Sequence, residues 1–231
     1  MINEKSNSGA FRFDIITLFP EMFVGPFSES ILKKAQIKEL ISINFHALRG
    51  YTTDKHQTVD DTPYGGGKGM ILKVDVMDRA IEDVKSKALA AGKKPHVVLL
   101  SPKGTKLNQD KVRELADKYD DLIMVCGHYE EFDERIREYL VDEDISIGDF
   151  ILTGGELPAM MLVDSVSRMV PGVLSEGSAE DETFMKKDEN GEFLKEHPQY
   201  TRPETYKEWS VPEILKSGDH GKIAKWRKEK V

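Results

Sequence analysis

The stretch ISIGDFILTGGELPAMMLVDSVSR, residues 145–168, begins as an apolar strand, passes through a glycine-bearing loop and ends as a helix whose first turn carries Glu156. Other short apolar runs rich in β-branched residues precede it, with helical patterns between them. Strands that alternate with helices favour a largely parallel sheet covered on both faces, which is an α/β fold. The expected strands are RFDIITLF (12–19), LISINFHA (40–47), HVVLLS (96–101), DLIMVC (121–126) and DISIG (144–148).

Helices are expected between these strands and after the last one. Apolar residues from Val74 to Ala88 keep helical spacing, and Asn108 can cap a second helix that runs to Tyr119. AMMLVDSVSRMV (159–170) is a third helical segment. Ligands of parallel sheets bind beyond the carboxyl ends of the strands, so the loops after the strands are the candidate site. These loops are SPKGTK (101–106), GHYEEFDER (127–135) and GDFILTGGELP (148–158).

Composition predicts a soluble cytoplasmic protein with no membrane partner. The chain has 231 residues, of which 39% are hydrophobic and 32% charged, and no apolar run approaches the roughly 20 residues of a membrane span. The N-terminal MINEKSNSGA lacks the apolar core of a signal peptide. Cys126, the single cysteine, excludes an internal disulfide, and its apolar surroundings favour inert burial over reactivity.

Three regions are expected along the chain. Residues 1–174 carry the strand and helix pattern, 175–197 form a polar, acidic stretch typical of a flexible linker, and 198–231 are short and helical in tendency. The last region is too small to bury a large core alone, so it should pack on the first domain or on a partner subunit.

The net charge of −8 argues against a surface that binds nucleic acid everywhere. A local basic cluster is compatible with either a solvated helix or an RNA-contacting one: Lys222, Lys225, Arg227 and Lys228, with Trp226 among them.

A second glycine-rich stretch, TVDDTPYGGGKGM (58–70), does not match the known phosphate motifs. Lys68 lacks the Walker A glycine and the following Ser or Thr, and a GxGxxG pattern that starts at Gly65 fails at Met70. Two interpretations remain: a backbone that a flat ligand approaches closely, or an ordinary surface loop. In the loop 148–158, free backbone N–H and C=O groups could read a purine edge.

Metal and nucleophile motifs are missing from the sequence. The histidines show no HxxxH or Cys/His pairing, so structural zinc is not expected, and there is no GxSxG motif. Catalysis would therefore depend on carboxylates, arginine and positioning. Asp164 and Arg168 are four residues apart on one helix face, and this spacing alone is typical of a surface ion pair.

Several segments together resemble the bacterial tRNA (guanine-37-N1)-methyltransferases of the knotted SpoU–TrmD superfamily. They follow the family order over nearly the whole chain. The segments are DIITLFPEMF (14–23), DKHQTVDDTPYGGGKGM (54–70), LSPKGTKL (100–107), VCGHYEEFDERI (125–136), SIGDFILTGGELPAMMLVDSVSRMVPGVL (146–174) and PQYTRPETYKEWSVPEILKSGDHGKIAKWR (198–227).

This resemblance implies a deep trefoil knot in residues 1–174, S-adenosylmethionine bound in that knot, and a homodimer that methylates N1 of guanine 37 in tRNA. A branched side chain at Gly155 would occupy cofactor space and disfavour unusual backbone angles. The implied cofactor residues are Leu100, Ser101, Pro102, Gly127, Tyr129, Glu130, Ile147, Gly148, Asp149, Phe150, Ile151, Leu152, Gly154, Gly155 and Pro158. The implied tRNA contacts are Asp60, Tyr64, Gly67, Lys68 and Gly69, which would wall the guanine site, together with Lys222, Lys225 and Arg227 of the small, helical tRNA-binding domain.

The resemblance also implies the catalytic groups. Arg168 would stabilise charge on guanine O6, and a linker carboxylate would accept the N1 proton. The family aspartate aligns with Glu182, with Asp181 as the alternative, and both acids could instead be solvated linker charges. Mg²⁺ is a further family expectation without a ligand motif in this chain.

This sequence departs from the family pattern at several points. Many relatives carry Pro or Ala at Lys68 and Arg at His128, and their linkers are shorter than this one. Relatives also continue beyond AKWR, so a reduced RNA-binding domain is expected. A non-catalytic RNA-binding relative is therefore the alternative function. The failed phosphate motifs disfavour a nucleotide hydrolase.

Overall fold

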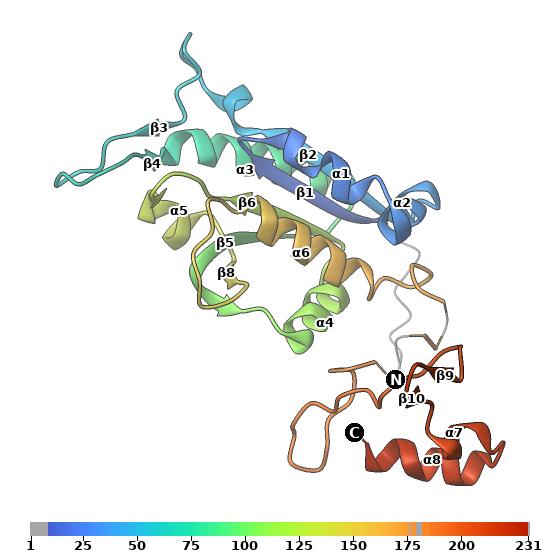
Figure 1. Ribbon diagram of the computed structural model, residues 1–231. Coiled ribbons are helices and arrows are strands. Elements are labelled where there is room, and N and C mark those ends of the chain that lie inside the picture. The colour runs from blue at the N-terminus through green and yellow to red at the C-terminus, as the bar shows by residue number, and fades with distance from the viewer. Residues whose placement is uncertain (1–8, 176, 179–181, 231) are drawn as a thin grey trace. The chain divides into compact units, whose positions relative to one another are not determined.

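The computed structural model describes residues 9–175, 177–178 and 182–230. The chain forms two compact units, residues 1–174 and 175–231, which are described separately (Figure 1). Among the described residues, no helix is both long and apolar enough to span a bilayer.

A five-stranded parallel sheet forms the centre of the first unit. Its order is β2-β1-β6-β5-β8, and every neighbouring pair is parallel, so the expected α/β architecture is confirmed. All five expected strands are present. They are β1 (Phe11–Thr17), β2 (Ile41–Ala47), β5 (Pro95–Lys106), β6 (Asp121–Cys126) and β8 (Glu143–Ser146).

Both faces of this sheet are buried, because alternate strand residues enter two separate apolar clusters. Val98 and Met124 belong to one cluster, whereas Val97 and Ile123 belong to the other. The first cluster includes residues of α1 (Val24–Phe27), α2 (Ser30–Ile37), α4 (Gln109–Lys118), α6 (Glu156–Ser167) and the 3₁₀ turn η1 (Pro20–Phe23). The second includes residues of α3 (Val74–Ala90), α5 (Glu134–Tyr139) and the 3₁₀ turn η2 (Leu48–Tyr51).

A local signal sets the start of α4 where the sequence predicted it. The Asn108 side chain accepts a hydrogen bond of 2.9 Å from the Lys111 backbone N–H, so it caps α4 as expected.

Cys126 is buried at the end of β6, and burial, with a smaller effect from the charge of Glu156, raises the pKa of its thiol. The thiol is therefore inert, as the sequence indicated.

Strand β5 bends so that its two halves pair with the same strand. Leu100 and Thr105 both pair with Ile145 of β8. Gly104 lies in the bend, where an added Cβ would come within 2.5 Å of the Asp144 carbonyl carbon and the Ile145 nitrogen. Only glycine permits this backbone contact, which brings residues 101–103 next to the end of β8.

A small three-stranded sheet, which the sequence did not predict, carries the glycine-rich loop. It consists of β3 (Asp60–Asp61), β4 (Ile71–Leu72) and β7 (Glu131–Phe132), and the loop between β3 and β4 extends outward in Figure 1. Gly65, Gly66, Gly67 and Gly69 all have positive φ, and an added Cβ at Gly65 or Gly66 would meet nothing within 4 Å. Within this chain, backbone conformation therefore accounts for these two glycines, and close packing does not.

Four ionisable side chains of β1, β2 and β6 lie close together. Asp14 and Asp121 are buried, and Arg12 contacts both carboxylates. His46 lies 2.5 Å from Asp14. Burial and repulsion from Asp14 raise the pKa of Asp121 to about 8. At Asp14 burial opposes ionisation, but hydrogen bonds from His46 and Arg12 lower its pKa.

The second unit contains little regular structure. It has a two-stranded antiparallel hairpin of β9 (Thr205–Tyr206) and β10 (Trp209–Ser210), followed by α7 (Glu213–Lys216) and α8 (His220–Glu229). The hairpin departs from the helical expectation. Asp219 caps α8 through its side chain. Residues 182–197 include a bridge between Lys187 and Phe193.

Candidate active site

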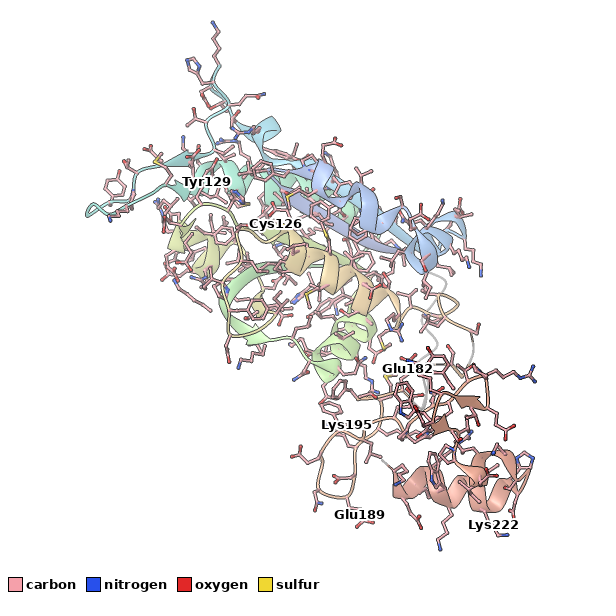
Figure 2. The ribbon with its side chains drawn as sticks, in the orientation of Figure 1. Cys126, Tyr129, Glu182, Glu189, Lys195 and Lys222 are labelled. Carbon is pink, nitrogen blue, oxygen red and sulfur yellow. The ribbon has the colours of Figure 1, made fainter. Side chains whose placement is uncertain are left out.

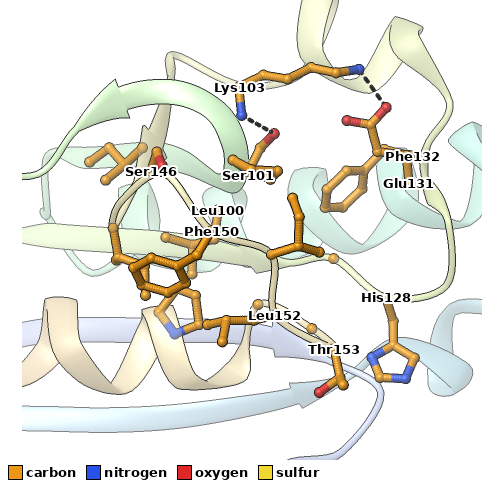
Figure 3. A pocket seen from close by; sticks show the side chains of 18 of the residues that line it. Leu100, Ser101, Lys103, His128, Glu131, Phe132, Ser146, Phe150, Leu152 and Thr153 are labelled. Atoms are coloured by element: carbon orange, nitrogen blue, oxygen red, sulfur yellow. Dashed lines mark hydrogen bonds and ion pairs between the residues drawn. The ribbon is translucent and has the colours of Figure 1, made fainter.

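A cavity of about 460 Å³ lies at the carboxyl ends of β6 and β8 and at the bend of β5 (Figure 3). All the predicted cofactor residues except Asp149 line it. Its walls are Leu100, Ser101, Pro102, Lys103, Gly127, His128, Tyr129, Glu130, Glu131, Phe132, Ile145, Ser146, Ile147, Gly148, Phe150, Ile151, Leu152, Thr153, Gly154, Gly155 and Pro158. Three loops that are distant in sequence therefore meet where the parallel-sheet rule placed the site.

Asp149 differs from the prediction because its side chain points away from the cavity. It is largely exposed and forms an ion pair with Lys106. Its neighbours Gly148 and Phe150 do line the cavity. The run of cofactor residues from Ile147 to Leu152 is thus interrupted at one solvent-facing position.

The structure does not show the unusual backbone angles expected at Gly155, but it does show a close backbone contact there. Its φ of −82° is ordinary for any residue. An added Cβ would lie 2.7 Å from the Cys126 Cα and 2.8 Å from the Gly127 nitrogen, so the obstruction is the backbone of the neighbouring loop. The Gly155 N–H also donates to the Gly127 carbonyl at 2.8 Å. Gly155 therefore joins two cavity loops directly, backbone to backbone.

A buried carboxylate lies behind the glycine pair. Glu156 is 1% exposed, and its Oε1 accepts a hydrogen bond of 2.8 Å from the Thr17 hydroxyl. Its other oxygen is 4.0 Å from Nδ1 of His128, which lines the cavity. Glu156 and Thr17 therefore form a buried hydrogen-bonded pair next to the His128 side of the cavity.

Tyr129 lies on the cavity wall in a strained conformation. Its φ is +64°, a value that non-glycine residues adopt rarely and at a cost of about 1–3 kcal/mol. Its ring is 43% exposed and meets the His128 ring edge-on, with centroids 5.4 Å apart. Such strain concentrates at ligand sites, and here it presents an aromatic ring beside the cavity.

A profile of the family described as tRNA (Guanine-1)-methyltransferase TrmD matches residues 11–231. The chain belongs to this family. It is 53% identical over 219 residues to the tRNA (guanine-N(1)-)-methyltransferase of Syntrophomonas wolfei, 52% over 218 to that of Bacillus pumilus and 48% over 218 to that of Dehalococcoides mccartyi. These alignments cover 94% of this chain and 84%, 86% and 84% of the respective relatives.

The residues that the resemblance assigned to catalysis do not all belong to the first unit. Arg168 does not line the cavity; it is the C-cap of α6, ten residues beyond Pro158, or about 15 Å along the helix. Glu182 lies in the second unit, whereas Tyr129 and Cys126 lie in the first (Figure 2). Asp181 is outside the described residues.

The predicted tRNA contacts of the first unit do not line the cavity, although Gly69 packs against Glu130, which does. Asp60 belongs to β3, and Tyr64, Gly67, Lys68 and Gly69 belong to the exposed loop that follows it; none of these lines the cavity. The loop is nevertheless anchored beside it, because the Glu130 N–H donates to the Met70 carbonyl at 3.2 Å. In the second unit, the predicted basic side chains on α8 are exposed: Lys222, Lys225 and Arg227.

The cofactor residues implied by the resemblance omit seven residues of the cavity lining. Five of the seven lie within the three loops that the sequence analysis named as the candidate site, and the other two, Ile145 and Ser146, end strand β8. The seven are Lys103, His128, Glu131, Phe132, Ile145, Ser146 and Thr153. Among the described residues, no group of three or more His, Cys, Asp or Glu side chains is arranged to hold a metal ion.

The lining fits an adenosyl cofactor in size and chemistry. Ligand cavities measure about 300–1,000 Å³ and combine apolar walls with a few polar groups. Here Leu152, Phe150 and Pro158 supply apolar surface. The buried Ser101 hydroxyl adds a polar group. Such a lining can enclose a flat base and sugar while backbone groups read the base edge.

Proposed function

We propose that this protein transfers a methyl group from S-adenosylmethionine to N1 of guanine 37 in tRNA, with the cofactor in the cavity between the three loops. The observation that carries the proposal is the convergence of those loops. Nearly every residue that the family resemblance assigned to the cofactor lines one cavity of about 460 Å³. Family membership over residues 11–231 supports the same function.

The reaction requires a base because guanine N1 carries a proton at neutral pH. The cofactor supplies the methyl group. In our proposal Glu182 accepts the N1 proton, and Arg168 stabilises the negative charge that develops on O6. A glutamate can replace an aspartate here if the backbone lies about one carbon–carbon bond further back.

We further propose that the active site is shared between two copies of the chain. Leu157 and Met161 on α6 are 48% and 51% exposed, four residues apart, and Arg168 follows seven residues later on the same face. Exposed apolar side chains on a helix favour a protein–protein contact. A homodimer through this face would bring Arg168 to an interface, while the chain's own cavity lies at the opposite end of α6.

The trefoil knot is also part of the proposal. It is supported by the bend of β5, whose two halves pair with the same residue of β8, and by the packing of Gly155 against Gly127. We assign tRNA binding to the second unit and the glycine-rich loop, because basic side chains on α8 suit a phosphate backbone. Mg²⁺ stays a family expectation and is given no role here.

The decisive experiment separates cofactor binding from methyl transfer. Titration calorimetry of the free protein with S-adenosylmethionine should show binding without RNA. Radiolabelled cofactor should then label an unmodified tRNA transcript with guanine 37, and a matched transcript with adenine 37 should stay unlabelled. Absence of cofactor binding refutes the site. Binding of both cofactor and tRNA without transfer would instead identify a non-catalytic RNA-binding relative.

The dimer has its own test. Sedimentation velocity at micromolar concentration should give a species of twice 26.1 kDa. Met161→Glu should shift it toward monomer and abolish methyl transfer. Leu89→Glu is the matched control, because Leu89 is 57% exposed on α3, across the sheet from α6. A monomeric, active wild-type protein would refute the shared site.

A further inference from the structure

An arginine outside the cavity lining contacts the chain segments that form one wall. Arg137 lies on α5, and its side chain is 18% exposed. Its guanidinium donates to Glu134 at 2.7 Å and pairs with Asp144. Its Nη2 also donates to the Ser101 hydroxyl oxygen at 2.9 Å and lies 3.7 Å from Glu131.

These partners belong to three segments that meet only through tertiary structure. Ser101 is in β5, Glu131 is in β7 and Asp144 is in β8. Ser101 and Glu131 line the cavity, and so does Ile145, which follows Asp144. A planar guanidinium has donors in fixed directions, so one side chain can hold several acceptors at defined positions. Arg137 therefore fastens one wall of the cavity from behind.

The contacts of Ser101 determine what its hydroxyl can do. Its oxygen accepts from Arg137 and also from the Lys103 backbone N–H, at 3.2 Å (Figure 3). A hydroxyl has two acceptor lone pairs and one O–H donor, so both acceptor positions are filled. Ser101 is 5% exposed, and its O–H has no acceptor among the described residues. Because Ser101 lines the cavity, an occupant of the cavity can supply the missing acceptor.

We propose that Arg137 is a positioning residue that makes Ser101 an obligate hydrogen-bond donor to the cofactor. This inference rests on the proposed function, because it takes the occupant of the cavity to be S-adenosylmethionine. The partner of Ser101 is then an acceptor atom of the cofactor, such as an adenine ring nitrogen or a carboxylate oxygen. Without Arg137, the hydroxyl regains a free lone pair, can rotate, and loses this fixed role.

A double-mutant cycle on cofactor affinity tests the proposal. Ser101→Ala should raise the Kd for S-adenosylmethionine by about 2–10-fold, the range expected for one neutral hydrogen bond. Arg137→Gln should raise it to a similar extent. The double variant should bind no more weakly than the weaker single variant, because Ser101 contributes little once Arg137 is gone.

Two further variants distinguish positioning from general stability. Arg137→Lys keeps the positive charge but not the planar fork, so it should also eliminate the Ser101 effect and serves if Arg137→Gln fails to fold. Arg79→Gln is the matched control, because Arg79 also joins a backbone carbonyl (Tyr51) and a carboxylate (Asp75), away from the cavity. Its Kd should equal that of the wild type.

The outcomes separate this inference from the proposed function. If the wild-type protein does not bind S-adenosylmethionine, the proposed function fails. If it binds, but Ser101→Ala has the same effect on Kd with and without Arg137, the positioning role is refuted and the cofactor site stands. Thermal unfolding of each variant shows whether a change in Kd follows a loss of stability.

Discussion

Replacing Gly155 by alanine tests whether the cavity depends on backbone contact between loops. The substitution adds one methyl group at a φ of −82°, which alanine adopts freely. Elsewhere such a change would stabilise a protein by about 0.4–1 kcal/mol, because it restricts the unfolded chain. Here the Cβ would lie 2.7 Å from the Cys126 Cα and 3.1 Å from its carbonyl carbon, and backbone atoms cannot rotate away.

The cost can be estimated from the contacts that must change. Overpacking by a methyl group costs about 1–3 kcal/mol, and stretching the Gly155–Gly127 hydrogen bond costs about 0.5–1.5 kcal/mol more. After the favourable unfolded-state effect is subtracted, Gly155→Ala should lower the free energy of unfolding by about 0.5–4 kcal/mol. Gly155→Val adds two more carbon atoms and should abolish cofactor binding.

Urea unfolding followed by far-UV circular dichroism is the suitable assay. Both tryptophans, Trp209 and Trp226, lie in the second unit, so tryptophan fluorescence would not report on the first. Gly50→Ala is the control, because an added Cβ there meets nothing within 4 Å. If the two alanine variants unfold within 0.5 kcal/mol of each other, taking roughly 0.5 kcal/mol as the usual limit for neutral substitutions, the steric reasoning is wrong.

Three other predictions concern charge. The raised pKa of Asp121, about 8, keeps this side chain protonated in the folded state, and unfolding releases the proton, so the free energy of unfolding falls as pH rises. Asp121→Asn should remove about 1.4 kcal/mol per pH unit from this dependence between pH 5 and 7. Identical dependences in the variant and the wild type would contradict the assignment. Glu182→Gln should slow single-turnover methyl transfer by about 10²–10⁴-fold while Asp181→Asn changes it little; the reverse result would move the base to Asp181. Reversing the charge of the basic side chains on α8 should weaken tRNA binding and lower its salt dependence by roughly one unit of slope per lost phosphate contact. Unchanged binding would show that these side chains are merely solvated. They are Lys222, Lys225, Arg227 and Lys228.

The central sheet could be predicted because its determinants are local. Each of the five strands is a short apolar run, and alternate residues such as Val97 and Val98 fill different clusters. The cap at Asn108 is likewise contained within a few residues of sequence. Strands of two residues, such as β3 and β4, carry no such periodicity. They exist because β4 pairs with β7, a distant segment.

The cavity was predicted through the family resemblance and the rule for parallel sheets, whereas the physical role of Gly155 was not. A glycine that avoids strain and a glycine that avoids a neighbouring backbone look identical in sequence. Only the three-dimensional approach of Cys126 and Gly127 distinguishes them. The same ambiguity affected the stretch 58–70, where positive φ, not close packing within the chain, accounts for Gly65 and Gly66.

Arg137 shows why a supporting residue is harder to find than a lining residue. In sequence it lies in the largely charged stretch from Asp133 to Glu138, where nothing distinguishes it from Arg135. Arg135 is 59% exposed and pairs with Asp133 nearby. Arg137, two residues further along α5, instead faces β5 and β8. Its guanidinium donates hydrogen bonds to Ser101 and Asp144. The difference between the two arginines is therefore set by the packing of α5 on the sheet, and only a structure that brings residues 36 positions apart into hydrogen-bond contact can reveal it.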